Sequence, residues 1–285
     1  MTNARLAGRI EHPSGKDASD CALEIPPATS LPRLPASHRL FGLPIPNDYE
    51  AMSRAAADFM AAEIRAKPTA LLCLAGGTSP SRAYELLATY QRTEPRLFDN
   101  VRLLKLDEWG DLPMDDPATC EVYLRQKLVG PLRIGPDRFT SWDSQASDPL
   151  AECRRMTHWL SDNGPIDLTI LGVGANGHLG LNEPADELPS GPHLAELSEI
   201  SKTHPMLGKA KCKAWRGYTL GVGDILKSRK ILLVVSGAHK AEQMGRFFSQ
   251  RISTRFPASL LWLHPALTIL CDRAALSRLP KDLLP

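Results

Sequence analysis

The feature that most constrains this chain is a repeated alternation, after residue 46, of short apolar runs with amphipathic segments of helical spacing. The apolar runs are typical of strands that a parallel sheet buries on both faces. Strands are predicted at 70–74, 101–106, 166–171, 231–235 and 267–271, and helices at 49–60, 80–90, 117–129, 149–161 and 239–248. This order predicts an α/β fold with a single doubly wound, mainly parallel sheet flanked by helices.

Proline marks where the folded region is expected to begin. Residues 1–45 contain six prolines and little periodicity, a composition that disfavours both helices and central strands. We therefore expect a proline-rich N-terminal tail at 1–45 and a single catalytic α/β domain at 46–285, since no internal repeat or interior linker interrupts the pattern. Asn47 or Asp48 is placed to cap the first helix of that domain.

Composition favours a small ligand over a polymer or a membrane. The net charge is +2, from 34 basic and 32 acidic residues without a dense Lys/Arg block, so neither nucleic acid nor a membrane surface is expected as a partner. The apolar runs are too short to span a bilayer and no signal peptide opens the sequence, so we expect a cytoplasmic location. The six cysteines lack metal-site spacing and are expected to be reduced, without a metal or a disulfide framework.

The most informative local motif is Leu-Gly-Val-Gly-Ala-Asn-Gly-His-Leu-Gly-Leu-Asn-Glu-Pro at 171–184. A predicted buried strand runs directly into four glycines, which let the backbone turn and approach a ligand. His178 and Glu183 follow five residues apart and form a candidate proton-transfer pair. A histidine after a glycine turn is also a common structural loop residue. The position favours function, because ligands of open α/β sheets bind outside the carboxyl ends of the strands.

The strand predicted at 70–74 also ends in a polar loop. Gly76, Gly77, Thr78 and Ser79 precede Pro80, which suits the first position of a helix that Ser79 is expected to cap. Glycines let the backbone approach a phosphate, and the free amides of a helix start attract anions. A tight strand-to-helix turn explains the same residues equally well, because the segment matches neither common phosphate-loop pattern.

Two further strand ends carry charge. Asp107 and Glu108 follow the strand predicted at 101–106, and one of them is a candidate general base, although acidic pairs also cap helices or solvate loops. Lys240 stands at the start of the helix predicted at 239–248, where a lysine opposes the helix dipole. That mild local penalty favours a role for Lys240 in binding a phosphate.

Taken together and in this order, these segments resemble the glucosamine-6-phosphate deaminase/isomerase family, within the wider group that includes the 6-phosphogluconolactonases. The resemblance covers most of residues 48–275. The segments most similar to its galactosamine-6-phosphate deaminase/isomerase branch are Lys-Leu-Asp-Glu-Trp at 105–109, Asn-Gly-His-Leu-Gly at 176–180 and Pro-Ala-Ser through Trp-Leu-His at 257–264. The resemblance implies conversion of a 6-phosphorylated 2-amino-2-deoxyhexose to a ketohexose 6-phosphate and ammonia, without a metal or organic cofactor, by an enzyme whose relatives are often homo-oligomers.

The resemblance also implies a role for each candidate residue. His178 protonates the ring oxygen to open the pyranose, a step suited to an imidazole, and Glu183 orients it. Asp107 moves the C2 proton to C1, giving an enolamine and then an imine that loses ammonia. The 6-phosphate is assigned to Gly76, Gly77, Thr78, Ser79 and Lys240.

Two positions depart from the family pattern. Asn176 stands where an aspartate is expected, so His178 has one carboxylate neighbour fewer and ring opening rests on Glu183. His204 aligns with the phosphate-binding arginine of the family. As a weaker and pH-dependent cation, it predicts that phosphate affinity falls as the pH rises through neutrality. The alternative is that one of three lysines supplies the charge: Lys202, Lys209 or Lys211.

Three other functions stay open on the sequence. A 6-phosphogluconolactonase-type hydrolase would use His178 to activate water, although the Asn-Glu-Pro ending at 182–184 and the acidic pair favour the deaminase. An aldose-ketose isomerase would act on a phosphosugar that lacks the amine. A non-catalytic sugar-phosphate sensor would bind without turnover, as Asn176 and His204 allow. Galactosamine 6-phosphate is the favoured substrate, followed by glucosamine 6-phosphate.

Overall fold

The computed structural model describes residues 45–280, so the tail expected at 1–45 lies outside the described residues except for Ile45. The centre of the described region is a six-stranded sheet in the order β4-β2-β1-β5-β8-β9, with every neighbouring pair parallel. Its strands are β1 (Leu71–Leu74), β2 (Arg102–Lys105), β4 (Phe139–Thr140), β5 (Leu168–Leu171), β8 (Lys230–Val235) and β9 (Leu267–Cys271). The predicted α/β fold with a doubly wound parallel sheet is confirmed. The division into a tail and one catalytic domain stays a prediction.

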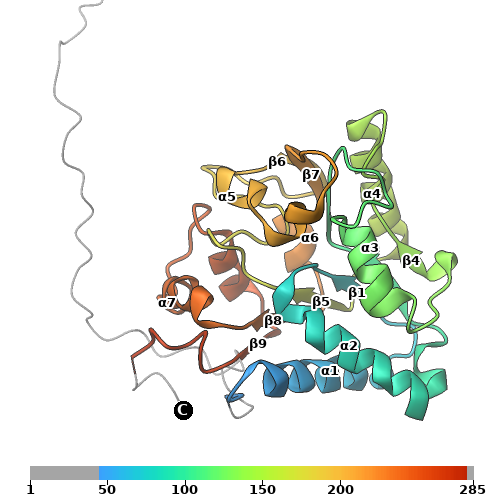
Figure 1. The fold of residues 1–285 in the computed structure, drawn as a ribbon, viewed down its shortest axis with the longest axis horizontal. Coiled ribbons are helices and arrows are strands. Elements are labelled where there is room, and N and C mark those ends of the chain that lie inside the picture. The colour runs from blue at the N-terminus through green and yellow to red at the C-terminus, as the bar shows by residue number, and fades with distance from the viewer. Residues whose placement is uncertain (1–44, 281–285) are drawn as a thin grey trace, which may run out of the picture. The chain divides into compact units, whose positions relative to one another are not determined.

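Helices cover both faces of this sheet, and Figure 1 shows α1 and α2 side by side along one of them. The α-helices are α1 (Tyr49–Ala66), α2 (Thr78–Thr93), α3 (Cys120–Leu124), α4 (Pro149–Asn163), α5 (Glu199–Lys202), α6 (Val222–Leu226) and α7 (Ala241–Phe248). Short 3-10 turns link them at η1 (Pro95–Phe98), η3 (Pro136–Arg138), η4 (Pro205–Lys209), η5 (Ala238–Lys240) and η6 (Pro257–Leu263), and a π-helical turn, η2 (Arg125–Val129), extends α3.

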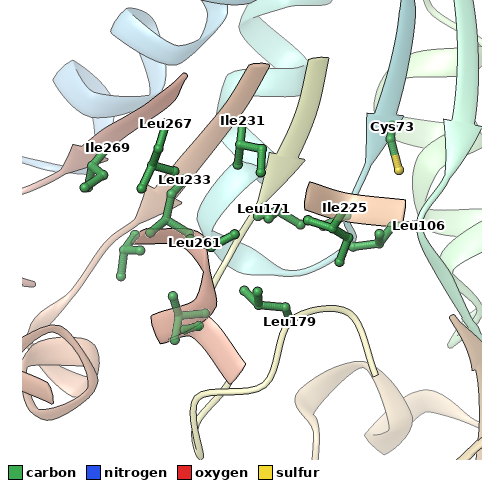
Figure 2. Packing of buried hydrophobic residues seen from close by; sticks show 14 of the residues in the cluster. Cys73, Leu106, Leu171, Leu179, Ile225, Ile231, Leu233, Leu261, Leu267 and Ile269 are labelled. Carbon is green, nitrogen blue, oxygen red and sulfur yellow. The ribbon is translucent and has the colours of Figure 1, made fainter. Parts of the chain in front are cut away.

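The strands have apolar residues at successive positions because both of their faces are buried. Along β8, Leu232 and Val234 pack into the cluster that contains α1 and α2, whereas Ile231, Leu233 and Val235 join the cluster on the opposite face. Figure 2 shows Ile231 and Leu233 on the same side of the sheet as Leu261 of η6. Because helices cover both faces of the sheet, every position along these strands is buried, and the strands therefore need continuous apolar runs.

The helix starts are only partly as predicted. The Asp48 side chain caps α1 by accepting a hydrogen bond of 2.8 Å from the amide of Ala51, as expected. At α2 the prediction that Ser79 is the cap is wrong. The positive φ of Gly77, 101°, turns the chain into the helix earlier, so that Gly77 occupies the cap position and the helix begins at Thr78.

A second, smaller sheet was not predicted. It is antiparallel, in the order β3-β7-β6, with β3 (Asp107–Trp109), β7 (Arg216–Thr219) and β6 (His193–Glu196). Figure 1 shows β6 and β7 on the opposite side of the main sheet from α1. The chain crosses between the sheets at Leu106, whose amide donates to Leu74 of β1 and whose carbonyl accepts from Leu220. The strands of the smaller sheet are short and pair with segments far away in the sequence, so local periodicity gave no sign of them.

The strand order creates a crevice at one place in the main sheet. β1 and β5 are neighbours, but the chain leaves β1 toward β2 and β4 on one side and leaves β5 toward β8 on the other. Loops that leave in opposite directions from the carboxyl ends of adjacent strands leave room for a ligand between them. The two glycine-rich segments found in the sequence, at 76–79 and 172–180, follow these two strands.

Other expectations from composition can be compared with residues 45–280. The five cysteines in this range are free thiols, and Cys73, Cys153 and Cys271 are buried among apolar side chains. Cys21 lies outside the described residues. Within the same range, none of the helices is both long and apolar enough to cross a bilayer.

Replacing Leu233 by alanine should test the core. The side chain is fully buried in β8, so Leu233→Ala should lower the free energy of unfolding by about 2–5 kcal/mol through lost burial and the cavity that it leaves. Leu150→Ala is the control, because Leu150 is 67% exposed, and its effect should stay within about 0.5 kcal/mol. Urea denaturation measures both, and equal losses would contradict the packing described above.

Candidate active site

A pocket of about 330 Å³ lies at the carboxyl ends of β1 and β5, a volume within the range of small-molecule sites. The loops that follow the strands of the main sheet form most of it, and the segment from α5 to η4 forms one wall. The sequence-predicted residues that line it are Gly76, Gly77, Thr78, Ser79, Asp107, His178, His204 and Lys240. Asn176 and Glu183 do not line the pocket, but both belong to the hydrogen-bond network of His178.

One end of the pocket is the start of helix α2. Gly77 gives the helix no side-chain cap, so the first amides of a 16-residue helix have no side-chain acceptor. The tyrosine hydroxyls of Tyr49 and Tyr123 donate to the carbonyls of Thr78 and Gly77, at 2.6 and 2.7 Å, and hold the turn in place. Free amides at the positive end of a helix dipole form a site for an anion such as a phosphate.

Lys240 brings a positive charge to the same pocket. Its Nζ donates to the carbonyl of Val173 at 2.7 Å, which holds the side chain against the loop after β5. Burial lowers the pKa of Lys240. Its position depends on the turn at Gly237, where φ is 94° and the amide donates to Asp272 at 3.1 Å. An anion in the pocket would stabilise the charged form of Lys240.

His204 lines the pocket in a partly apolar setting. Its ring lies 5.4 Å from that of Trp109, and its Nδ1 accepts from the amide of Met206 at 3.3 Å. Burial, with the charges of His178 and Lys240, lowers the pKa of His204 to about 4. Desolvation therefore favours the neutral ring of His204 in the pocket without a ligand, and its role in binding a phosphate stays a prediction.

The three lysines considered as substitutes are also not at the pocket. None of Lys202, Lys209 and Lys211 lines it. Lys202 instead pairs with Glu199 at 2.7 Å, and its Nζ lies 5.0 Å from the centre of the Trp215 ring. Among the residues that line the pocket within the described chain, Lys240 is therefore the one lysine or arginine.

The structure shows which carboxylate of the acidic pair faces the pocket. Asp107 lines it and is only 9% exposed, and its Oδ1 has no hydrogen-bond partner among the described residues. Burial and then the negative charge of Glu108 raise the pKa of Asp107 to about 7, against the opposing effect of Lys105. A carboxylate of this kind is a stronger base than an exposed one and is available to a ligand.

Glu108 points away from the pocket into a buried ion network. Its Oε2 accepts from Lys105 Nζ at 2.5 Å, and that ammonium also donates to Glu121 at 2.9 Å. The Glu108 carboxylate further accepts the amides of Trp109, Cys120 and Glu121 at 2.8–2.9 Å. Glu108 thus holds the start of α3 and keeps β3 in place. Of the two roles considered for the acidic pair, Glu108 has that of capping a helix.

His178 is held by polar groups on the side of its Nδ1. That nitrogen lies 3.5 Å from Glu183 Oε2 and 3.3 Å from the hydroxyl of Ser201. Burial alone would raise the pKa of Glu183. The hydrogen bond and charge of His178, followed by the hydrogen bonds of Ser201 and Asn176, outweigh this effect and lower the pKa of Glu183 to about 2. The loop must have glycine at 174, because a Cβ there would lie 2.2 Å from the His178 ring.

Sequence reasoning missed two residues of this region, Ser201 and Lys105. Ser201 comes from α5, a helix of four residues without a strong periodic signal, and reaches His178 from 23 positions away in the chain. Lys105 was recognised only as part of a family motif, and its complete burial could not be read from its neighbours. No group of three or more His, Cys, Asp or Glu side chains within residues 45–280 is arranged to hold a metal ion.

The raised pKa of Asp107 predicts a pH-dependent stability cost. The native carboxyl titrates at about 7 and an unfolded one near 3.8, so the native state binds the proton more tightly and loses stability as the pH rises through this range. Asp107→Asn removes that loss. The free energy of unfolding of this variant, relative to that of the wild type, should rise by roughly 2.5 kcal/mol between pH 5 and pH 8. The wild type loses about 1.4 kcal/mol for each pH unit up to the native pKa.

Urea denaturation at the two pH values measures this difference, with the exposed Asp162→Asn as the control variant. The control should keep the wild-type pH dependence. A parallel pH dependence for Asp107→Asn and wild type would show that Asp107 is not the raised carboxyl.

The chain is similar to a known family of sugar-phosphate enzymes and to individual members of it. The family described as glucosamine-6-phosphate isomerases/6-phosphogluconolactonase matches residues 47–269. AgaI of Escherichia coli (strain K12), provisionally named a deaminase, is 41% identical over 217 residues, which cover 76% of this chain and 86% of that protein. Glucosamine-6-phosphate deaminase 1 of Bacillus subtilis (strain 168) is 36% identical over 237 residues, which cover 81% of this chain and 97% of that protein.

Solved structures give a consistent result. A monomeric glucosamine-6-phosphate deaminase superposes with a TM-score of 0.76 and 35% identity, over 81% of this chain and 97% of that one. The 6-phosphogluconolactonase of Trypanosoma brucei superposes with a TM-score of 0.70 but only 19% identity, over 83% of this chain and 97% of that one. The second similarity shows a shared fold alone.

Proposed function

Because this chain belongs to the family of glucosamine-6-phosphate isomerases and 6-phosphogluconolactonases, we propose that it is an aminosugar-phosphate deaminase that releases ammonia and forms a ketohexose 6-phosphate. Within the family, similarity supports the deaminase side. The two glucosamine-6-phosphate deaminases compared share 35% and 36% of residues with this chain, whereas the Trypanosoma lactonase shares 19%. Galactosamine 6-phosphate is the proposed first substrate, on the strength of the motifs at 105–109, 176–180 and 257–264.

The observation that carries this proposal is the environment of Asp107. A buried carboxylate with a raised pKa and an unpartnered oxygen shares one pocket with a helix start suited to a phosphate. Such a carboxylate suits removal of a proton from carbon next to a carbonyl, the central step of an aldose-ketose isomerisation. Hydrolysis of a lactone requires no proton transfer from carbon, and in the lactonase alternative His178 activates the water.

The first step under this proposal is ring opening. His178 takes the proton of the anomeric hydroxyl at its Nε2 and delivers it to the ring oxygen as the bond between C1 and that oxygen breaks, which gives the open-chain aldehyde. Glu183 is ionised and lies beside the opposite nitrogen of the ring, so it stabilises the cationic form before the transfer.

The second step is proton transfer between two carbons. Asp107 in its ionised form removes the proton at C2, and the electron pair forms an enolamine as the C1 oxygen takes a proton from water. The same carboxyl then delivers a proton to C1 while the nitrogen returns one to water, which gives an imine at C2. Water adds to that imine, and ammonia leaves to give the ketone. The start of α2 and Lys240 hold the phosphate, so that binding energy from the far end of the sugar orients C2 toward Asp107.

Incubation with three substrates tests the function directly. We expect ammonia and ketose phosphate from galactosamine 6-phosphate or glucosamine 6-phosphate, and no acceleration of the spontaneous hydrolysis of 6-phosphogluconolactone. In deuterated water, the wild type should exchange the C2 proton, and Asp107→Asn should lose this exchange by roughly 10²- to 10⁴-fold. Binding of the substrate by Asp107→Asn, measured by calorimetry, should persist.

The outcomes separate the alternatives. Ammonia from neither aminosugar would contradict a deaminase. Acid from the lactone faster than without the protein would identify a lactonase, and tight binding without any turnover would identify a sensor. Exchange that persists in Asp107→Asn would show that another residue is the base.

The phosphate assignment makes a separate prediction for Lys240. A hydrogen bond to a charged group contributes about 1.5–3 kcal/mol, so Lys240→Met should raise the KM for the phosphosugar by roughly ten- to a hundredfold. Lys202→Met is the matched control, because Lys202 lies outside the pocket, and it should change KM by less than about twofold. An equal effect of the two variants on KM would remove Lys240 from the phosphate site.

A further inference from the structure

Ser201 is a buried hydroxyl that no part of the family resemblance assigned. It is 2% exposed, and it stands between the two groups of the proposed ring-opening pair. Its hydroxyl donates to Glu183 Oε1 and lies 3.3 Å from Nδ1 of His178. A buried hydroxyl placed between a carboxylate and an imidazole controls where the protons of both can lie.

Counting donors and acceptors locates the proton of the neutral His178 ring. Glu183 is ionised and can only accept, and the single proton of Ser201 is already given to Glu183. The hydroxyl of Ser198 donates to Ser201 at 3.2 Å, which leaves a lone pair of Ser201 for His178. Both groups beside Nδ1 of His178 are thus acceptors, so Nδ1 must carry the proton.

We propose that Ser201 is a positioning residue whose hydroxyl, oriented by Glu183, keeps a proton on Nδ1 of His178 and leaves Nε2 as the nitrogen that meets a ligand. The consequence for ring opening rests on the proposed function. The tautomer itself does not, because it follows from the hydrogen bonds of the protein alone.

Asn176 fits this arrangement better than the aspartate of the family pattern. Its Nδ2 donates to Glu183 Oε2 at 2.7 Å, and its Oδ1 accepts the amide of His178 at 3.2 Å. An aspartate has no proton to donate when ionised and would place a second negative charge beside Glu183. Asn176 and Ser201 are therefore two neutral donors that hold Glu183, where the family pattern has a second carboxylate.

The experiment reads the tautomer of His178 by ¹⁵N NMR of the full chain, without a ligand. The pH is raised until the ring is neutral, and the signals of His178 are assigned by their loss in His178→Gln. We expect wild-type Nδ1 to be protonated and Nε2 to be bare. A proton on Nε2 in the wild type would overturn the proposal, whatever the variants do and whether or not the protein is a deaminase.

Two variants separate positioning from stability. Ser201→Ala should shift the neutral ring of His178 toward a mixture of tautomers. It should lower kcat by about tenfold, which is less than the loss of an acid-base group would cause, and change KM by less than about twofold. Ser228→Ala is the control, because it also deletes a buried hydroxyl, one bonded to Thr169 at 2.7 Å, away from the pocket. It should keep the tautomer and kcat of the wild type. An unchanged tautomer in Ser201→Ala, or a loss seen only in KM, would contradict the role.

Discussion

The rest of the site depends on the buried ion network of Lys105, Glu108 and Glu121. Removing two carboxylates and an ammonium from water is costly, and such a network is tolerated only when every member is paired. Here Lys105 lies between both carboxylates, and Glu108 also accepts three backbone amides, including those that begin α3. The end of β2, strand β3 and the start of α3 are joined at one point. Asp107 projects from that point into the pocket.

The surroundings of two carboxylates near the pocket shift their pKa values in opposite directions. Asp107 is buried beside the charge of Glu108 and has no hydrogen-bond partner on Oδ1, so its pKa rises to about 7. Glu183 is partly buried but receives hydrogen bonds from an imidazole, a hydroxyl and an amide, so its pKa falls to about 2. When the pKa values of two carboxylates differ in this way, one can exchange protons while the other stays ionised and holds a neighbouring charge in place. This division matches a proton-transferring Asp107 and an orienting Glu183.

The end of the pocket proposed to bind phosphate depends on backbone amides more than on side-chain charge. Lys240 is the one lysine or arginine among the lining residues of the described chain, and burial against Trp109 lowers the pKa of His204. The uncapped start of α2 supplies the remaining positive potential. Its placement follows from topology, because β1 and β5 are adjacent strands whose chains leave in opposite directions.

The sequence by itself determined five of the six strands of the main sheet, the helices between them and the residue types at its carboxyl edge, because periodicity, caps and glycine turns act over a few neighbouring residues; the two-residue strand β4 is too short for such a pattern. It could not determine which of Asp107 and Glu108 faces the pocket. That choice follows from the pairing of β3 with β7, more than a hundred residues away, since neighbouring side chains of a strand point to opposite faces. The charge state of His204 and the contact of Ser201 with His178 were likewise decided only by the tertiary structure, because burial and hydrogen-bond partners depend on segments that meet only in the folded chain.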